Sequence, residues 1–139
     1  MKKTIYSAIS LLMTMVIALC LVSCTSNDNP WDFATYTEDT TFGNGSKTVV
    51  VEVTVLEQKV TFTINTDEDT VGAALSEHNL ISGEEGQYGL YVKKVNGITA
   101  DYDIDQSYWA FYVNDEYAMS GIELTEISED ATYQLVYTK

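Results

Sequence analysis

The sequence predicts an α+β domain in which a mixed sheet carries one short helix on one face. Residues 49–55 alternate apolar and polar side chains with the period of two that is typical of a half-buried strand, and residues 60–65 repeat this pattern. From residue 71 a short stretch places its apolar residues at helical spacing. At least three further strand-like segments follow, and this order of elements is typical of an α+β domain.

The N-terminus indicates export. Two lysines follow Met1, and apolar residues then run to Leu21-Val22-Ser23-Cys24. A basic start and an apolar run are typical of a signal peptide. Its end resembles the lipobox of bacterial lipoproteins, in which the signal is cut before a cysteine that carries a diacylglycerol. We therefore expect a signal peptide over 1–23, lipidation of Cys24 and an extracytoplasmic protein anchored to a bacterial membrane.

A plain transmembrane anchor is the alternative, since a spanning helix needs about 20 apolar residues. The polar tract that follows Cys24 at once favours the lipoprotein. Cys20 is removed with the signal, so the mature chain has no free thiol and no disulfide. Cysteine catalysis and thiolate metal sites are then excluded.

Residues 24–46 are polar and rich in turn-forming residues, which predicts a flexible tether ahead of a domain over 47–139. The tether contains four aromatic residues, and we expect one or two of them to dock on the domain. The alternative is a tail that binds a partner. The four are Trp31, Phe33, Tyr36 and Phe42.

The first elements of the domain are a hairpin and the helix. Glu57-Gln58 separates the two alternating strands closely enough for a hairpin. Asp69 or Thr70 is suited to cap a helix over 71–79, because a side-chain oxygen there accepts bonds from unpaired N–H groups of the first turn. Residues 83–86 are predicted to be a loop.

Three more strands are predicted over 89–95, 108–114 and 132–137, with tight turns at Asn96-Gly97 and Asn114-Asp115. The second of them places Trp109, Phe111 and Val113 on one face and Tyr108, Ala110 and Tyr112 on the other. The whole order favours a β-grasp-like fold, in which the final strand lies beside the first.

Charge and composition exclude several functions. The chain has 7 Lys+Arg against 21 Asp+Glu and a net charge of -14, which argues against a nucleic-acid partner. It has no Arg and a single histidine, His78, which we expect to make local contacts rather than bind metal. No serine lies in a nucleophile motif and no glycine-rich phosphate loop occurs. We therefore expect a protein that is not an enzyme and that uses no cofactor.

Three acids at odd positions, Asp101, Asp103 and Asp105, have the start of a calcium-loop pattern. The sixth and twelfth positions are Gln106 and Tyr112 instead of Gly and Glu, so the EF-hand motif fails. A solvated loop is preferred, with a looser oxygen-ligand cation site as the alternative. We assign no metal site.

The region from Gly89 to Gly121 is similar to the C-terminal domain of the transcobalamin and intrinsic factor family. The matching residues are Gly89, Val95-Asn96-Gly97-Ile98, Tyr108-Trp109 with Phe111, and Gly121, together with Thr70-Val71 and Ala74-Leu75 at the helix. The resemblance extends over about 48–139. It implies a β-grasp module that, in the cobalamin carriers, closes over one face of the corrinoid. The mature chain is too short to supply the large helical domain that covers the other face in those carriers.

By position, the resemblance places a ligand against the aromatic strand and a bend of small residues. The candidate residues are Tyr108, Trp109, Phe111, Tyr112, Ala118, Met119, Ser120 and Gly121. For Trp109 and Phe111 a place in the core is the favoured interpretation, because large aromatic residues of a central strand usually pack inside.

Two functional hypotheses follow. The first is a lipid-anchored protein that captures a small flat ligand, such as cobalamin or another corrinoid, with a second protein as a candidate for closing the other face. The second is an interaction module that recognises an envelope protein or polymer and has no small-molecule pocket.

Overall fold

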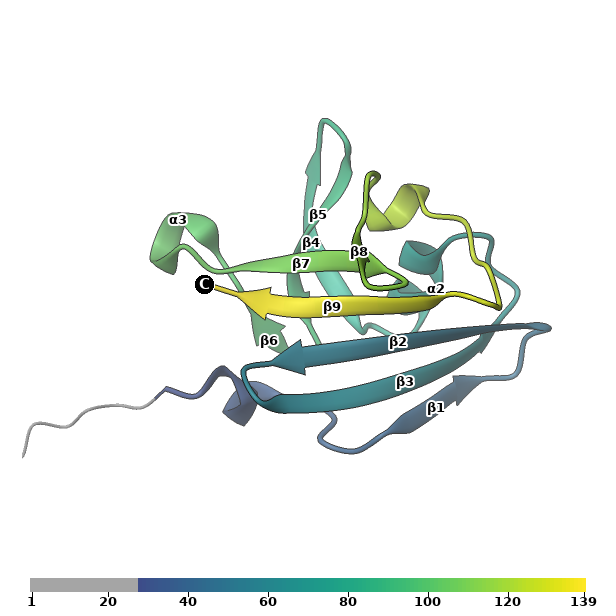
Figure 1. Ribbon diagram of the computed structural model, residues 1–139, viewed down its shortest axis with the longest axis horizontal. Coiled ribbons are helices and arrows are strands. Elements are labelled where there is room, and N and C mark those ends of the chain that lie inside the picture. Colours follow the sequence, from purple (N-terminus) through teal and green to yellow (C-terminus); the bar gives the residue numbers. More distant parts are fainter. Residues whose placement is uncertain (1–27) are drawn as a thin grey trace, which may run out of the picture.

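The structure is a computed structural model that describes residues 28–139 (Figure 1). The predicted signal peptide and the predicted lipidation site at Cys24 lie outside the described residues. Within 28–139, no helix has both the length and the apolar character needed to cross a membrane.

A mixed six-stranded sheet forms the body of the domain, in the order β1-β3-β2-β9-β7-β8. Its β2 pairs antiparallel with β3 and parallel with β9, so the final strand lies beside the first strand of the hairpin, as predicted. The bounds are β1 (Thr40–Gly43), β2 (Lys47–Val55), β3 (Gln58–Thr66), β7 (Tyr108–Val113), β8 (Glu116–Tyr117) and β9 (Thr132–Thr138).

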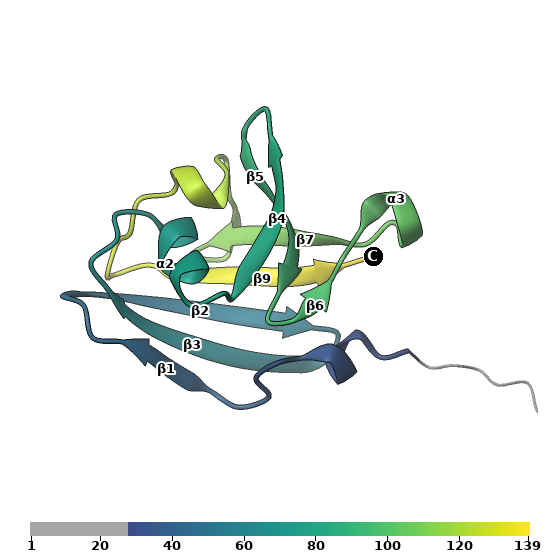
Figure 2. The same cartoon turned by 180° about the vertical axis from the view of Figure 1, so that it is seen from behind.

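A second, three-stranded sheet is built from β4 (Ile81–Gly86), β5 (Gly89–Val95) and β6 (Ile98–Thr99). Figure 2 shows it with the helix α2 (Val71–Glu77) on one face of the large sheet. The prediction of a loop over 83–86 is wrong, because these residues pair with β5. Their side chains are exposed, so no apolar alternation reveals the strand.

Helices are short throughout the described residues. Thr70 caps α2 as predicted, its side chain accepting a bond from the N–H of Ala73 at 3.3 Å. A second α-helix, α3 (Tyr102–Asp105), replaces the predicted solvated loop, so the expectation of one helix is wrong. Asp101 caps it by accepting from Asp103 N at 3.0 Å. Two 3-10 turns complete the set, η2 (Pro30–Phe33) and η3 (Ile122–Leu124).

The core lies between the large sheet and the layer formed by α2 and the small sheet. The alternating valines of β2 are fully buried, and Phe62 and Ile64 of β3 lie beside them. From the other layer Leu75 of α2 and Val95 of β5 close the core. Burial of these side chains is the main favourable term in folding.

The segment before residue 47 is part of the domain, in contrast to the predicted flexible tether. Strand β1 pairs parallel with β3, and Phe42 on it contacts Phe62 edge-on with ring centroids 5.7 Å apart. Trp31 and Tyr36 also pack against the core, so three of the four aromatic residues dock on the domain where one or two were expected. Their partners, Phe62 on β3 and Asn96 in the turn between β5 and β6, are remote in sequence, so local composition predicted only a polar linker.

Candidate functional site

A hollow of about 260 Å³ opens at one edge of the core, between β5, β7 and the segment that follows β7. We call it the site hollow. Its lining residues come from four separate stretches of the chain, and they are Leu90, Tyr91, Val92, Trp109, Phe111, Tyr117, Ala118, Met119, Ser120, Gly121, Ile122 and Leu135.

Two aromatic residues of β7 form its inner wall. Trp109 is only 7% exposed and contacts Tyr137 edge-on, with ring centroids 5.7 Å apart. Phe111 is half-buried and stacks on Tyr133 at 6.3 Å. The indole Nε1–H of Trp109 is buried and has no acceptor among the described residues. Both rings therefore pack against the core and also line the site hollow. The two interpretations from the sequence, core packing and a place at the ligand, are thus compatible.

The bend from Ala118 to Gly121 forms the outer wall. The N–H of Ala118 donates to the carbonyl of Phe111 at 2.9 Å, which fixes the start of the bend to β7. At its end the hydroxyl of Thr125 donates to the carbonyl of Gly121 at 3.0 Å. Between these two anchors the side chain of Met119 is fully exposed at the rim.

One long-range hydrogen bond brings the small sheet to this bend. The N–H of Leu90, on β5, donates to Oε2 of Glu123 at 2.8 Å. Gly121 allows close approach, because a Cβ atom there would lie 3.2 Å from the carbonyl oxygen of Tyr88. The third wall of the hollow is thus positioned by a contact that spans 33 residues.

The residues that line the site hollow carry mainly apolar side chains, with hydroxyl groups on Tyr91, Tyr117 and Ser120. None of these residues carries a carboxylate, imidazole or ammonium group. Flat aromatic walls with a few polar atoms suit the binding of a flat, largely apolar molecule.

The structure brings six of the eight predicted ligand residues together and separates the other two. Trp109, Phe111 and the bend 118–121 line the site hollow. Tyr108 and Tyr112 alternate with these rings on β7 and face the other side of the sheet. Tyr112 contacts Tyr117 edge-on at 5.4 Å and does not line the hollow.

Sequence reasoning missed the β5 wall of Leu90, Tyr91 and Val92, together with Tyr117, Ile122 and Leu135. The alternation of Leu135 with its neighbours on β9 marks it as a core residue, but no local pattern shows that β5 lies against η3. Glu123, between the apolar residues Ile122 and Leu124, is the one available signal, because its carboxylate accepts from the N–H of Leu90 on β5.

The acids over 101–105 are engaged within the chain. Asp101 accepts from Lys93 at 3.4 Å as well as capping α3. Asp105 accepts from Lys139 at 3.0 Å and from the hydroxyl of Ser107. Within the described part of the chain no group of three His, Cys, Asp or Glu residues is placed to hold a metal ion.

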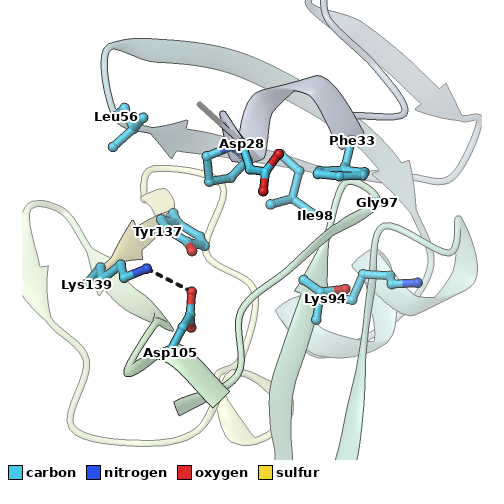
Figure 3. A pocket seen from close by; sticks show the side chains of 11 residues that line it. Asp28, Phe33, Leu56, Lys94, Gly97, Ile98, Asp105, Tyr137 and Lys139 are labelled. Carbon is cyan, nitrogen blue, oxygen red and sulfur yellow. Dashed lines mark hydrogen bonds and ion pairs between the residues drawn. The ribbon is translucent and has the colours of Figure 1, made fainter. Parts of the chain in front are cut away.

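A larger hollow of about 690 Å³ lies at the opposite end of the sheet (Figure 3). Phe33, Leu56 and Ile98 give it apolar walls, and the ion pair of Asp105 with Lys139 lies at its edge. The hydroxyl of Ser107, with the Lys139 ammonium, lowers the pKa of Asp105 from 3.8 to about 2. No local sequence pattern predicts this hollow, because Pro30 and Phe33 of η2 supply part of its wall.

Similar solved structures agree on this fold. A protein from Ruminococcus gnavus ATCC 29149, provisionally described as metal-binding, is 29% identical over 68% of this chain and 98% of its own, with a TM-score of 0.63. Haptocorrin in complex with Cbi, a member of the transcobalamin family, matches with a TM-score of 0.54 and 18% identity. That match covers 70% of this chain but only 26% of haptocorrin, and it shows the fold alone.

At the level of the fold, the likeness to haptocorrin confirms the predicted resemblance to the transcobalamin family. Of these two structures, the first is described as metal-binding and the second is in complex with Cbi. No curated protein matches the chain in sequence. A family model described as a domain of unknown function (DUF4430) matches residues 68–138, which is half of the chain and includes every residue of the site hollow. The chain therefore belongs to the DUF4430 family.

Proposed function

We propose that this protein is a lipid-anchored extracytoplasmic binding protein that captures a small flat ligand, such as cobalamin or another corrinoid, in the site hollow without catalysis. One observation carries the proposal. The rings of Trp109 and Phe111 and the bend 118–121, selected from the sequence by resemblance, lie around one hollow. A β-grasp-like module in which the helix α2 backs the sheet would hold these walls rigidly.

The size of the site hollow limits how it binds. Pockets that enclose drug-sized ligands measure about 300–1,000 Å³. At about 260 Å³ the site hollow takes one edge or face of a larger planar molecule and leaves the rest in solvent. A weak affinity is therefore expected for the isolated chain, with tighter binding when a second protein covers the other face.

Calorimetric titration of the purified full chain in detergent micelles with cobalamin and other corrinoids tests the proposal. We expect saturable binding that Phe111→Leu weakens about 5- to 10-fold, because the ring lines the hollow and an aromatic contact contributes about 1 kcal/mol. Phe42→Leu is the matched control, since Phe42 is also half-buried but does not line the hollow. Equal affinity of both variants, or no heat at high micromolar ligand, would contradict this site.

An interaction module is the second candidate, and one observation favours it. Five large apolar side chains are exposed around the site hollow, and two of them do not line it; they are Tyr88, Tyr91, Tyr117, Met119 and Leu124. Clustered exposed apolar residues are typical of protein interfaces. Pull-down from envelope extract with Tyr88→Ser/Leu124→Ser would separate the two functions, because neither residue lines the hollow. Loss of a partner with retained ligand binding would assign this rim to a protein.

A further inference from the structure

Exposed apolar side chains are confined to two ends of the molecule. Nine large ones are exposed among the described residues, and five of these surround the site hollow. The other four are Phe33 at 66% exposure, Leu56 at 65%, Tyr102 at 56% and Ile104 at 82%. In Figure 1 the elements that carry them, η2, the β2–β3 turn and α3, lie together near the C-terminus, away from β8. We call this surface the tether end.

The tether end is also where the N-terminal segment enters the domain. Asn29 is already fixed, because its side chain accepts from Trp31 N at 3.1 Å. The chain from 31 to 36 is then held by Asn96, whose Oδ1 accepts from Tyr36 N at 2.9 Å and whose Nδ2 donates to Tyr36 O at 2.8 Å. The N-terminal segment therefore leaves the domain at this surface.

Little chain remains between this point and the predicted lipid. Cys24 precedes Asn29 by five residues. Fully extended chain spans at most about 3.6 Å per residue, so the sulfur of a lipidated Cys24 lies within about 18 Å of the tether end. A tether of 23 residues would have allowed the domain to float free of the bilayer, but the packed segment 30–43 removes most of that length.

We propose that the tether end rests on the phospholipid bilayer, with Phe33, Leu56 and Ile104 inserted in its interface, and that the site hollow faces away from the membrane. This rests on the lipid anchor of the proposed function but not on ligand binding. Within residues 28–139 the larger hollow leaves Phe33 and Leu56 exposed, so both side chains can enter lipid (Figure 3).

The charge of the tether end determines whether it binds better to a neutral or to an anionic bilayer. Exposed acids Asp32, Glu57 and Asp103 lie next to the apolar residues, and they outnumber the exposed lysines that line the larger hollow at this end, Lys94 and Lys139, of which Lys139 is paired with Asp105. An anionic surface repels such groups, whereas apolar side chains enter the interface of any fluid bilayer. The contact is therefore expected to form on neutral phosphatidylcholine and to be weaker, not stronger, when phosphatidylglycerol is added.

The test uses the full lipidated chain reconstituted into phosphatidylcholine vesicles that contain nitroxide-labelled lipid. Single cysteines are introduced by Phe33→Cys, Leu56→Cys and Ile104→Cys and labelled with a small fluorophore; the acylated sulfur of Cys24 does not react. Met119→Cys and Leu124→Cys are the matched controls at the other end, where both side chains are exposed. Circular dichroism and vesicle flotation establish folding and attachment of each variant.

We expect the lipid quencher to reduce fluorescence at the three tether-end positions at least two-fold more than at the two controls. Equal quenching at both ends, or no quenching at the tether end of attached protein, overturns the proposal. Failure of the full chain to float with vesicles also overturns it, because the anchor itself is then absent. Corrinoid titration of the same samples is a separate readout, so failure of the ligand proposal is recognised independently.

Discussion

Asn96 links the N-terminal segment to the small sheet. It is buried, has a φ of 51°, and makes two hydrogen bonds to the backbone of Tyr36. Asn tolerates this left-handed conformation better than most residues, which is why Asn-Gly marks tight turns. The same residue thus forms the predicted turn and provides a contact across 60 residues that the sequence could not show.

Asn96→Ala is expected to lower the free energy of unfolding by about 2–4 kcal/mol, because two buried hydrogen bonds are lost and Ala disfavours positive φ. Urea denaturation measures the change. Asn96→Gly restores the backbone freedom but not the hydrogen bonds, so it should recover about 1 kcal/mol. Equal stability of wild type and Asn96→Ala would contradict this role.

Asp105 makes stability depend on acid pH. Hydrogen bonds from Ser107 and Lys139 lower its folded-state pKa to about 2, below the ordinary value of 3.8. The folded state therefore favours the ionised carboxylate. Its contribution is fully present above pH 4 and is lost as the pH falls toward 2.

Asp105→Asn should remove this part of the acid dependence. Urea midpoints measured between pH 5 and pH 2 are expected to fall less steeply for the variant than for the wild type. Carbon-detected NMR of the Asp105 carboxyl should give a midpoint near 2. A midpoint at the ordinary value would show that the contacts with Ser107 and Lys139 do not persist in solution.

At the scale of elements, the helix α2 positions η3, which directly follows the bend 118–121 at the site hollow. Gly72 of α2 lies so close to η3 that a Cβ atom would be 2.8 Å from Cα of Glu123. That distance is shorter than real Cβ contacts, so backbone would have to move. Glycine is unfavourable inside a helix, and close packing against η3 explains its presence here.

Gly72→Ala is expected to destabilise the protein by about 1–3 kcal/mol through overpacking, although Ala improves helix propensity by about 1 kcal/mol. Because η3 must shift, ligand affinity at the site hollow should fall as well. Ser76→Ala, at an exposed position of the same helix, is the control and should leave both unchanged or slightly improved. Urea denaturation measures the change. A higher free energy of unfolding for Gly72→Ala would contradict this explanation, because η3 would then move aside without destabilising the protein.

Local sequence patterns predicted some of the secondary-structure elements and missed others. Strands β2, β3, β7 and β9, the capped helix and the Asn-Gly turn follow from alternation and capping, and the structure confirms them. Strand β4 was missed because its Gly and Glu residues have low strand propensity and it exists only through pairing with β5. Gly83 is required there, since a Cβ atom would overlap the carbonyl oxygen of Tyr91.

The candidate site was also predictable only in part, because only some of its walls come from residues that are close in sequence. Trp109, Phe111 and the bend 118–121 are adjacent in sequence, so the resemblance located them. The β5 wall depends on the bond between Leu90 and Glu123, which no periodicity reveals. Tyr108 and Tyr112 were included although alternation already placed them on the opposite face of the strand.

At the scale of the molecule, the two hollows lie at opposite ends of one sheet. The smaller has walls of aromatic rings and small residues, and the larger adjoins the point where the N-terminal segment enters. A lipid at Cys24 would hold the second end near the bilayer and present the first to ligands or partners. The acidic composition, with a net charge of -14 for the full sequence, would keep such an anchored domain soluble beside the membrane.

Binding at the site hollow is the central claim, and NMR chemical-shift mapping of the isotope-labelled full chain during titration with cobalamin tests it most directly. We predict that the largest amide shifts fall on Leu90–Val92, on Phe111 and on the segment 118–122, and that they saturate together. Shifts centred instead on Phe33, Ile98 and Tyr137, or none at saturating ligand, would contradict it.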